Sequence, residues 1–346
     1  MIKIAQKLRP FSHVPGTHVL IPKSSLSAQI FPTRIILIEL TTNKKMEVQW
    51  DLHGSFEDFT IVQDLERLEV RVFARAQEGY FRFRLTAKKE GLSLFIERSP
   101  KEIAFTCNKK KKVLKEKEEW TIGLPTILFA QSKERLSLGS HKKQDWDLVK
   151  RREDMREVLP IWLRLSVPRI KTPKVGTASL LERGRIEKNE AEKYFQNLFQ
   201  IGFKGILVPR LMDDQHQGIV KEEPLPKDAN PLVLLSEGGH LIRSLFFRVE
   251  EHKLFLLPTL PKEFAFGRFV NLSSDWGEFD LEWSKKILRK AVFRAKKTGR
   301  IELVLQKQIQ NFRVRKSHRD KGKTFSRETP LLVEEDHTYI LDRFQK

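Results

Sequence analysis

Phe81-Arg82-Phe83-Arg84-Leu85-Thr86-Ala87-Lys88 is the stretch of sequence that decides the fold. Apolar residues alternate there with cationic or polar residues at every step. Because successive side chains of a β-strand point to opposite faces of a sheet, the pattern predicts a strand with one buried and one cationic face. Two neighbouring segments, 68–75 and 92–96, alternate in the same way. Turn-forming residues at 77–79 and 90–91 separate the three segments, which predicts antiparallel strands.

The alternation extends over most of the N-terminal third of the chain, from His18 to about Gly123. Several short strands at this spacing favour a β-sandwich over an α/β sheet. The basic run 108–112 is expected to form the tip of a solvated hairpin, where like charges discourage pairing between edge strands. Contact with a polyanion is its alternative use. Cys107 alternates with Phe105 and is expected to be a buried thiol on a strand.

The period changes to that of helices in the middle of the chain. Between about 144 and 165, apolar residues recur every three to four positions, which predicts an amphipathic helix. Pro160 is expected to end or kink this helix. Asn189 is predicted to cap a second helix, which would stop near Gly202.

A third helix is predicted to begin at Asn230-Pro231, with proline in the first helical position. Gly238 and Gly239 lower its helix propensity. The pair indicates that a packed neighbour approaches the helix closely at this point.

Alternation with a period of two returns from Lys253 to the end, for example in 279–283 and 301–305. The cation-rich segment 316–327 is expected to be a loop before a last strand near 338–341. The predicted fold class is therefore α+β and mostly β. We expect an N-terminal β-sandwich-like domain in residues 1–130, a helical linker region in 131–250 and a C-terminal β-sandwich domain in 251–346.

Length and composition set further limits on the class of protein. The chain has 346 residues, of which 40% are hydrophobic and 24 are phenylalanine, enough to fill the cores of two or three domains. The single cysteine excludes an intramolecular disulfide framework and a zinc site built from several thiolates. No apolar run is long enough to cross a membrane, and the first ten residues lack the apolar core of a secretory signal. We therefore expect a cytoplasmic protein without a membrane partner.

The charge balance is strongly basic. Lys and Arg number 65 and Asp and Glu 45, a formal net charge of +20. Such an excess raises affinity for polyanions, although a requirement for solubility would produce the same excess. A nucleic-acid-binding or polyanion-binding protein is therefore the alternative function. Its support in the sequence is the cationic face Arg82/Arg84/Lys88 and the basic segment 313–327.

Motifs for nucleotide, dinucleotide or zinc chemistry are missing from the sequence, and so is a Gly-x-Ser-x-Gly nucleophile motif. The run Asp213-Asp214-Gln215-His216 is either a metal-binding segment or a polar surface loop. Adjacent residues cannot all point at one ion, which favours the loop. We expect no metal and no cofactor.

Three segments near the C-terminus carry a resemblance to a known family. They are 256–264 (LLPTLPKEF), 267–270 (GRFV) and 277–283 (GEFDLEW). Together they resemble the C-terminal region of glycoside hydrolase family 95, the bacterial α-L-fucosidase-like enzymes, which share a clan with the maltose-phosphorylase-like families. The resemblance covers about 231–305, under a quarter of the chain. It implies a leading β-sandwich, an (α/α)6 barrel whose last helix corresponds to 232–247, and a C-terminal β-sandwich.

The chain is much shorter than members of that family, because a full barrel of about twelve helices separates their two β regions. Residues 144–247 have room for about four helices with their connections. The resemblance implies that Asp228, in Asp228-Ala229-Asn230, stands in the place of the catalytic base. A helix start capped by Asn230 is the other interpretation of this tripeptide. The general acid has no counterpart, and Glu237 is the nearest remaining carboxylate.

A glycosidase of this kind needs two carboxylates on either side of the bond that it cleaves. We therefore expect a catalytically degenerate relative that binds carbohydrate or a partner protein. Trp276 and Trp120 are candidates to stack on a sugar ring, and packing into the core is the alternative role of each. An interaction protein without a small ligand is the third interpretation.

Overall fold

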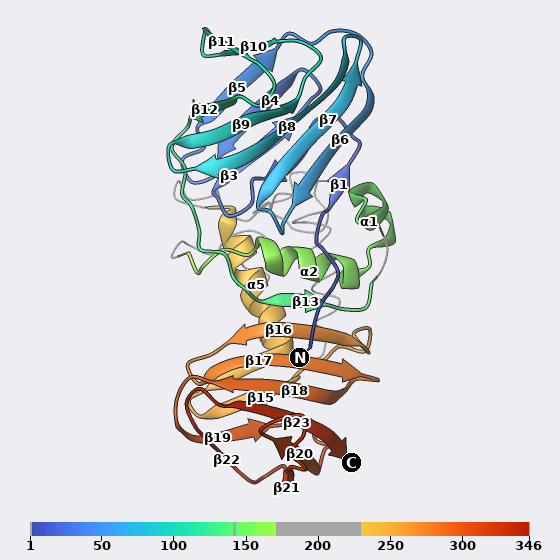
Figure 1. Cartoon of the computed structure of the whole chain (residues 1–346), viewed down its shortest axis with the longest axis vertical. Coiled ribbons are helices and arrows are strands. Elements are labelled where there is room, and N and C mark those ends of the chain that lie inside the picture. Colours follow the sequence, from blue (N-terminus) through green and yellow to red (C-terminus); the bar gives the residue numbers. More distant parts are fainter. Residues whose placement is uncertain (1, 141–142, 171–229, 346) are drawn as a thin grey trace, which may run out of the picture.

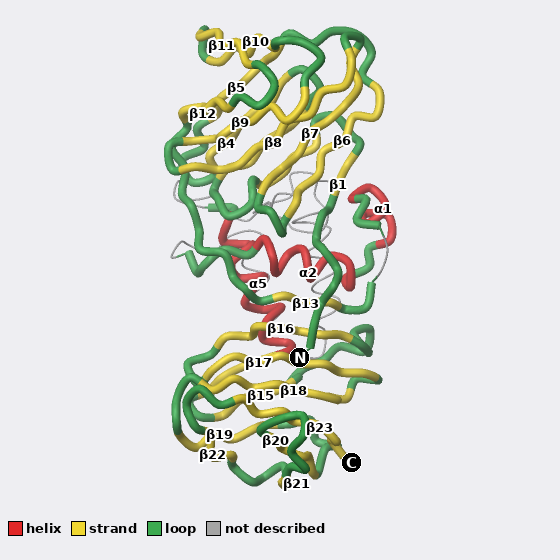
Figure 2. Tube along the Cα trace, in the orientation of Figure 1, coloured by secondary structure: helices red, strands yellow, loops and turns green. Residues whose placement is uncertain are grey.

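The structure is a computed structural model that describes residues 2–140, 143–170 and 230–345. Two β-rich modules lie at opposite ends of the molecule, with helices between them (Figures 1 and 2). Within the described residues, strands far outnumber the three helices. The predicted fold class, α+β and mostly β, is confirmed.

The N-terminal module consists of two six-stranded antiparallel sheets. In spatial order, the first sheet contains β1 (Phe11–Ser12), β6 (Glu57–Asp64), β7 (Glu69–Ala76), β8 (Gly79–Lys88), β9 (Gly91–Arg98) and β12 (Glu119–Gly123). The second contains β11 (Lys110–Leu114), β10 (Ile103–Cys107), β5 (Lys45–Trp50), β4 (Arg34–Glu39), β3 (Leu26–Ile30) and β2 (Thr17–Leu20). The ring of Trp50 on β5 lies 5.3 Å from that of Phe83 on β8, so the two sheets face each other across the core.

The alternation quoted from the sequence determines how β8 is oriented. Phe81 and Phe83 are buried in the core, while Arg82 and Arg84 are half-buried on the opposite face. The predicted cationic face is therefore confirmed. Cys107 is buried on β10, as expected. The lysine run 109–112 forms the turn and the exposed edge strand of the β10–β11 hairpin.

Two helices follow, α1 (Trp146–Arg152) and α2 (Met155–Leu165). The prediction of one helix interrupted at Pro160 is wrong, because the interruption lies at Glu153, in the left-handed conformation with φ of 52°. Asp154 then caps α2 by accepting a hydrogen bond from the backbone N–H of Arg156. Pro160 lies within α2 and removes only one backbone donor there. The predicted helix at 189–202 lies outside the described residues.

The predicted third helix is α5 (Leu232–Phe246). The side-chain oxygen of Asn230 accepts a hydrogen bond of 2.9 Å from the N–H of Leu232 at its start. The close neighbour that the glycine pair indicated is α2. Without a Cβ, Gly238 leaves room for the ring of Trp162, and Gly239 leaves room for the side chain of Ser166.

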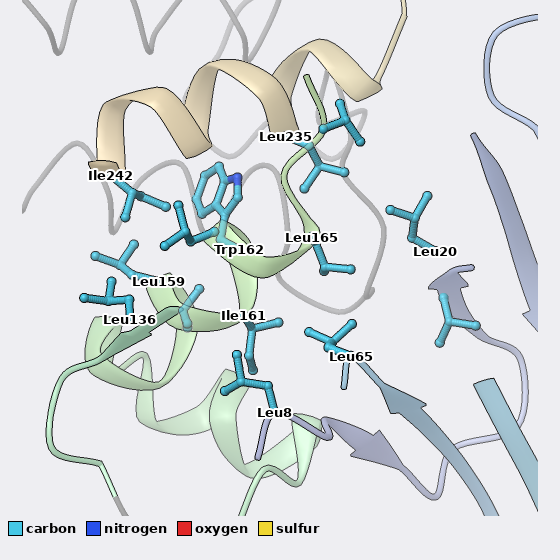
Figure 3. Packing of buried hydrophobic residues seen from close by; sticks show 14 of the residues in the cluster. Leu8, Leu20, Leu65, Leu136, Leu159, Ile161, Trp162, Leu165, Leu235 and Ile242 are labelled. Atoms are coloured by element: carbon cyan, nitrogen blue, oxygen red, sulfur yellow. The ribbon is translucent and has the colours of Figure 1, made fainter. Parts of the chain in front are cut away.

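Apolar side chains between the modules form one continuous core with both of them (Figure 3). Leu20 and Leu65 from the N-terminal module approach Leu165 of α2, while Trp162 packs against α5 on the other side. The helical layer thus joins the two β-modules through buried contacts. No described helix is long and apolar enough to cross a membrane.

The C-terminal module contains a seven-stranded and a four-stranded sheet. The larger sheet is ordered β13 (Arg135–Ser137), β16 (Gly267–Ser273), β17 (Gly277–Ser284), β18 (Ile287–Ala295), β23 (Thr338–Gln345), β20 (Asn311–Arg315) and β21 (Lys323–Ser326). The smaller is ordered β14 (Phe247–Glu250), β15 (Lys253–Leu256), β19 (Gly299–Val304) and β22 (Leu331–Val333). The pairing of β15 with β19 is parallel, and the other pairings in the module are antiparallel.

The segment 316–327, expected to be a loop, contains strand β21. Its charges do not prevent this strand from pairing with β20, on which Arg313 and Arg315 share the carboxylate of Asp342 from β23. Asp320 closes the turn by accepting hydrogen bonds from the backbone N–H groups of Lys316 and Gly322. The cation-rich sequence therefore forms a hairpin.

The predicted domain limits at 130 and 250 stay a prediction, but strand pairing links the predicted regions. Strands β13 and β14 belong to the predicted helical region and pair within the C-terminal sheets. The N-terminal residues cross to the same module, where Ile2 packs against Val270 and Val292. The N-terminal and middle regions of the chain are thus connected to the C-terminal module at several separate points.

Candidate functional site

The two tryptophans expected to stack on a sugar lie in different modules, and each is half-buried. Trp276 sits between β16 and β17, donates a hydrogen bond of 2.8 Å to the carbonyl of Glu251, and covers Gly299. Trp120 on β12 packs 6.2 Å from the ring of Phe105. Both rings pack against the core, and the structure does not bring them into one site.

Asp228, expected in the place of a catalytic base, lies outside the described residues, as does the run 213–216. Asn230, which follows Asp228 closely, is buried and hydrogen-bonded at the start of α5. In the described ranges, no group of three or more His, Cys, Asp or Glu side chains is placed to hold a metal ion.

A cavity of about 420 Å³ opens where α2 crosses α5. Three segments line it: the strand-free stretch before β13, the end of α2 with the residues after it, and one face of α5. Its lining residues are Ala130, Gln131, Ser132, Glu134, Leu163, Ser166, Val167, Pro168, Arg169, Ser236, Gly239, His240 and Arg243. The volume is in the range of pockets that hold small molecules. We call it the interhelical pocket.

The strongest ionic contact in the interhelical pocket joins Glu134 to Arg243 on α5. The Nε of Arg243 donates to both carboxylate oxygens of Glu134, at 2.9 and 3.1 Å. Glu134 also accepts a hydrogen bond of 3.0 Å from the N–H of Ser273, and Arg243 donates to the carbonyl of Ser273. This carboxylate therefore ties α5 to strand β16, and its oxygens are occupied by structural contacts.

Other charges at the interhelical pocket are also balanced. Arg169 lies 3.7 Å from the carboxylate of Glu237, which is buried on α5. Beside the pocket, burial lowers the pKa of Arg164, which donates to the carbonyl of Ser132. An arginine stays protonated despite such a shift, so Arg164 places one positive charge beside the pocket.

Three serine hydroxyls, of Ser132, Ser166 and Ser236, line the same pocket. Ser132 caps the backbone N–H of Glu134, and Ser166 donates to the carbonyl of Leu163. The hydroxyl of Ser236 has no hydrogen-bond partner although the residue is only 1% exposed. A buried hydroxyl without a partner costs roughly 1–3 kcal/mol.

The residues that line the interhelical pocket could not be identified from the sequence. Glu134 and Arg243 are separated by 109 positions, and neither belongs to a local motif. The one signal was the pair Gly238-Gly239, which marks the helix crossing at which the pocket forms. Only the three-dimensional packing of α2 on α5 brings the lining residues together.

No family model matches this chain, and no curated protein matches it. The resemblance to family 95 glycoside hydrolases therefore rests on the residues quoted above and stays a prediction.

Proposed function

We propose that this chain is a carbohydrate-binding protein derived from the fucosidase-like glycoside hydrolases, and that it holds a saccharide in the interhelical pocket without cleaving it. The observation that carries the proposal is a cavity whose wall contains the unpartnered hydroxyl of Ser236 and the largely exposed guanidinium of Arg169. Sugars present many hydroxyls, each of which donates and accepts hydrogen bonds, so such a lining suits them.

The junction between α5 and the C-terminal module supports the ancestry. The residues of the resembling segment 256–264 fold back onto the last turn of the helix. The N–H of Leu257 donates to the carbonyl of Phe246 at 2.8 Å, and that of Thr259 to the carbonyl of Leu245 at 3.4 Å. The segment thereby caps the helix C-terminus, after the chain has entered the C-terminal sheets through the β14–β15 hairpin. The resembling segment therefore lies against the last helix, and a hairpin separates the two along the chain.

Hydrolysis is expected to be lost. Inverting glycosidases use one carboxylic acid and one carboxylate roughly 6.5–9.5 Å apart, with a water between the carboxylate and the sugar. Glu134, the carboxylate lining the interhelical pocket, is held by Arg243 and the N–H of Ser273. Both oxygens of this carboxylate therefore accept hydrogen bonds from protein donors and face no partner carboxylate among the described residues that line the pocket.

A hydrolysis assay tests this part of the proposal. We expect no release of nitrophenol from 4-nitrophenyl α-L-fucoside or from the matching galactoside at any enzyme concentration. Turnover that Asp228→Asn abolishes would contradict the proposal, because it would show that the carboxylate chemistry of the family persists.

An array of neutral and fucosylated glycans tests the binding. We expect the full-length protein to be retained on a defined set of saccharides. Arg169 lines the interhelical pocket and its side chain is 65% exposed, so Arg169→Ala should weaken retention, and circular dichroism checks that the variant is folded. Arg289, an exposed residue of β18 in the C-terminal module, provides the matched control Arg289→Ala, which should bind as the wild type does. Failure of the wild type to bind any glycan would overturn the proposal.

A further inference from the structure

The outer face of the first N-terminal sheet places arginines directly opposite one another. Arg71 on β7 is the cross-strand partner of Arg84 on β8, and Arg82 on β8 is the partner of Arg98 at the end of β9. Like charges directly opposite each other destabilise an antiparallel pair. The chain keeps this arrangement in two adjacent pairs, so four guanidinium groups are gathered on one face.

Two glutamates lie beneath these arginines. The side chains of Glu69 and Glu97 are only 6% and 14% exposed, whereas those of Arg82 and Arg84 are 42% and 40% exposed. Glu69 lies 2.6 Å from Arg71, and Glu97 lies 2.7 Å from Arg82. The carboxylates are therefore more buried than the guanidinium groups with which they pair, and the solvent-exposed groups of this surface are positively charged.

Aromatic rings alternate with the arginines on the same face. The guanidinium of Arg84 lies 4.3 Å over the ring of Phe95, and that of Arg98 lies 5.3 Å over the ring of Tyr80. Phe73 adds a third ring, 6.4 Å from that of Tyr80. We call this surface the arginine shelf, comprising Arg71, Arg82, Arg84 and Arg98 with Phe73, Tyr80 and Phe95.

We infer that the arginine shelf binds single-stranded nucleic acid. Guanidinium groups recognise phosphates with paired hydrogen bonds, and rings and guanidinium planes both offer surfaces on which unpaired bases stack. The net charge of +20 would speed the encounter with such a polyanion. In Figure 1, strands β6 to β9 lie at the front of the N-terminal module and no described helix covers them.

The lysine hairpin of the same module provides a matched comparison. Lys110, Lys111 and Lys112 on β11 are exposed and carry the same number of charges as Arg82, Arg84 and Arg98 of the arginine shelf. The hairpin has no aromatic residue between its lysines. Non-specific electrostatic attraction would bind a polyanion equally well at both surfaces, whereas we expect single-stranded nucleic acid to bind only at the arginine shelf.

The experiment measures the binding of a fluorescein-labelled oligo(dT), about 20 nucleotides long to exceed the ~4–16 nucleotides of a typical single-strand site. Fluorescence anisotropy is followed from about 50 to 200 mM salt for the full-length protein. We expect Arg82→Gln/Arg84→Gln/Arg98→Gln to weaken binding at least tenfold and to flatten the log–log salt dependence by about 2, at roughly 0.7 per lost phosphate contact. Lys110→Gln/Lys111→Gln/Lys112→Gln should weaken it less than threefold.

A second pair of variants keeps the charge. Tyr80→Leu and Phe95→Leu should each weaken oligo(dT) binding about tenfold without altering the salt slope, because stacking is lost and phosphate contacts remain. Equal weakening by the two triple variants would overturn the proposal. Binding of heparin that tracks oligo(dT) binding and ignores both aromatic substitutions would also overturn it, in favour of an acidic polysaccharide. Circular dichroism checks that each variant is folded.

Discussion

Trp162 on α2 occupies the space that a side chain at Gly238 on α5 would need. A Cβ built on Gly238 would lie 2.5 Å from Cε2 and Nε1 of the indole, far inside contact distance. The missing side chain therefore permits the two helices to cross closely. The interhelical pocket opens beside this crossing, lined by Ser236 and Gly239 from the same turn of α5.

Gly238→Ala should therefore destabilise the protein. Overpacking a core costs about 1–3 kcal/mol, and alanine recovers only about 1 kcal/mol of helix propensity. We expect the free energy of unfolding, measured by urea denaturation, to fall by about 1–2 kcal/mol. Gly123→Ala is the control, since a Cβ there meets nothing within 4 Å. An unchanged or higher stability of Gly238→Ala would show that the indole ring is free to move away.

Asp342 is expected to stabilise the C-terminal sheet. It bridges Arg313 and Arg315 on the neighbouring strand, and all three side chains are less than a fifth exposed. Asp342→Asn should lower the free energy of unfolding by about 2 kcal/mol, the scale of hydrogen bonds between charged groups. Glu334→Gln breaks the exposed ion pair with Lys316 and should cost less than about 1 kcal/mol. A similar loss in the two variants would contradict this role for Asp342.

The carboxylate of Asp342 is also expected to make the stability of the protein depend on pH. Burial alone would raise the pKa of Asp342, but the hydrogen bonds from Arg313 and Arg315 outweigh it and lower the pKa below its ordinary value. An aspartate with a lowered folded pKa contributes stability above its unfolded pKa of about 3.9 and loses it as the pH falls through the folded pKa. Thermal unfolding temperatures of the wild type should thus fall more steeply below about pH 4 than those of Asp342→Asn. Parallel curves for the two proteins would contradict this assignment.

Cys107, the single cysteine, reports on the opening of the N-terminal module. It is 7% exposed on β10, and burial raises the pKa of its thiol. Ellman's reagent should therefore react at least about a hundredfold more slowly with the native protein than with the protein in denaturant, because reaction requires an exposed thiolate. Comparable rates in the two states would show that the β10 strand is accessible in the native protein.

Structural features that depend on short-range sequence patterns could be predicted. The alternation around Arg82 and Arg84 gave the correct orientation of β8, because one face of a strand must be buried. The glycine pair on α5 correctly indicated a close neighbour. The break between α1 and α2 was missed, because Asp154 competes with Pro160 as a boundary signal and only the fold decides between them.

Contacts between residues that are distant in the sequence could not be predicted. Strand β21 pairs with β20, on which Arg313 and Arg315 share the carboxylate of Asp342 from β23. The interhelical pocket likewise depends on the pairing of Glu134 with Arg243. The packing of Trp276 and of Trp120 also depends on neighbours from other parts of the chain. Each case requires the tertiary contact itself, which no local pattern encodes.

Blocking the interhelical pocket tests the proposed function most directly. Ser236→Leu adds bulk at a buried hydroxyl that has no hydrogen-bond partner, whereas Ser244→Leu adds the same bulk on α5 away from the pocket lining. On the glycan array, Ser236→Leu should lose the saccharides retained by the wild type, and Ser244→Leu should keep them, with both variants folded by circular dichroism. Equal retention by wild type and Ser236→Leu would contradict a saccharide site between α2 and α5.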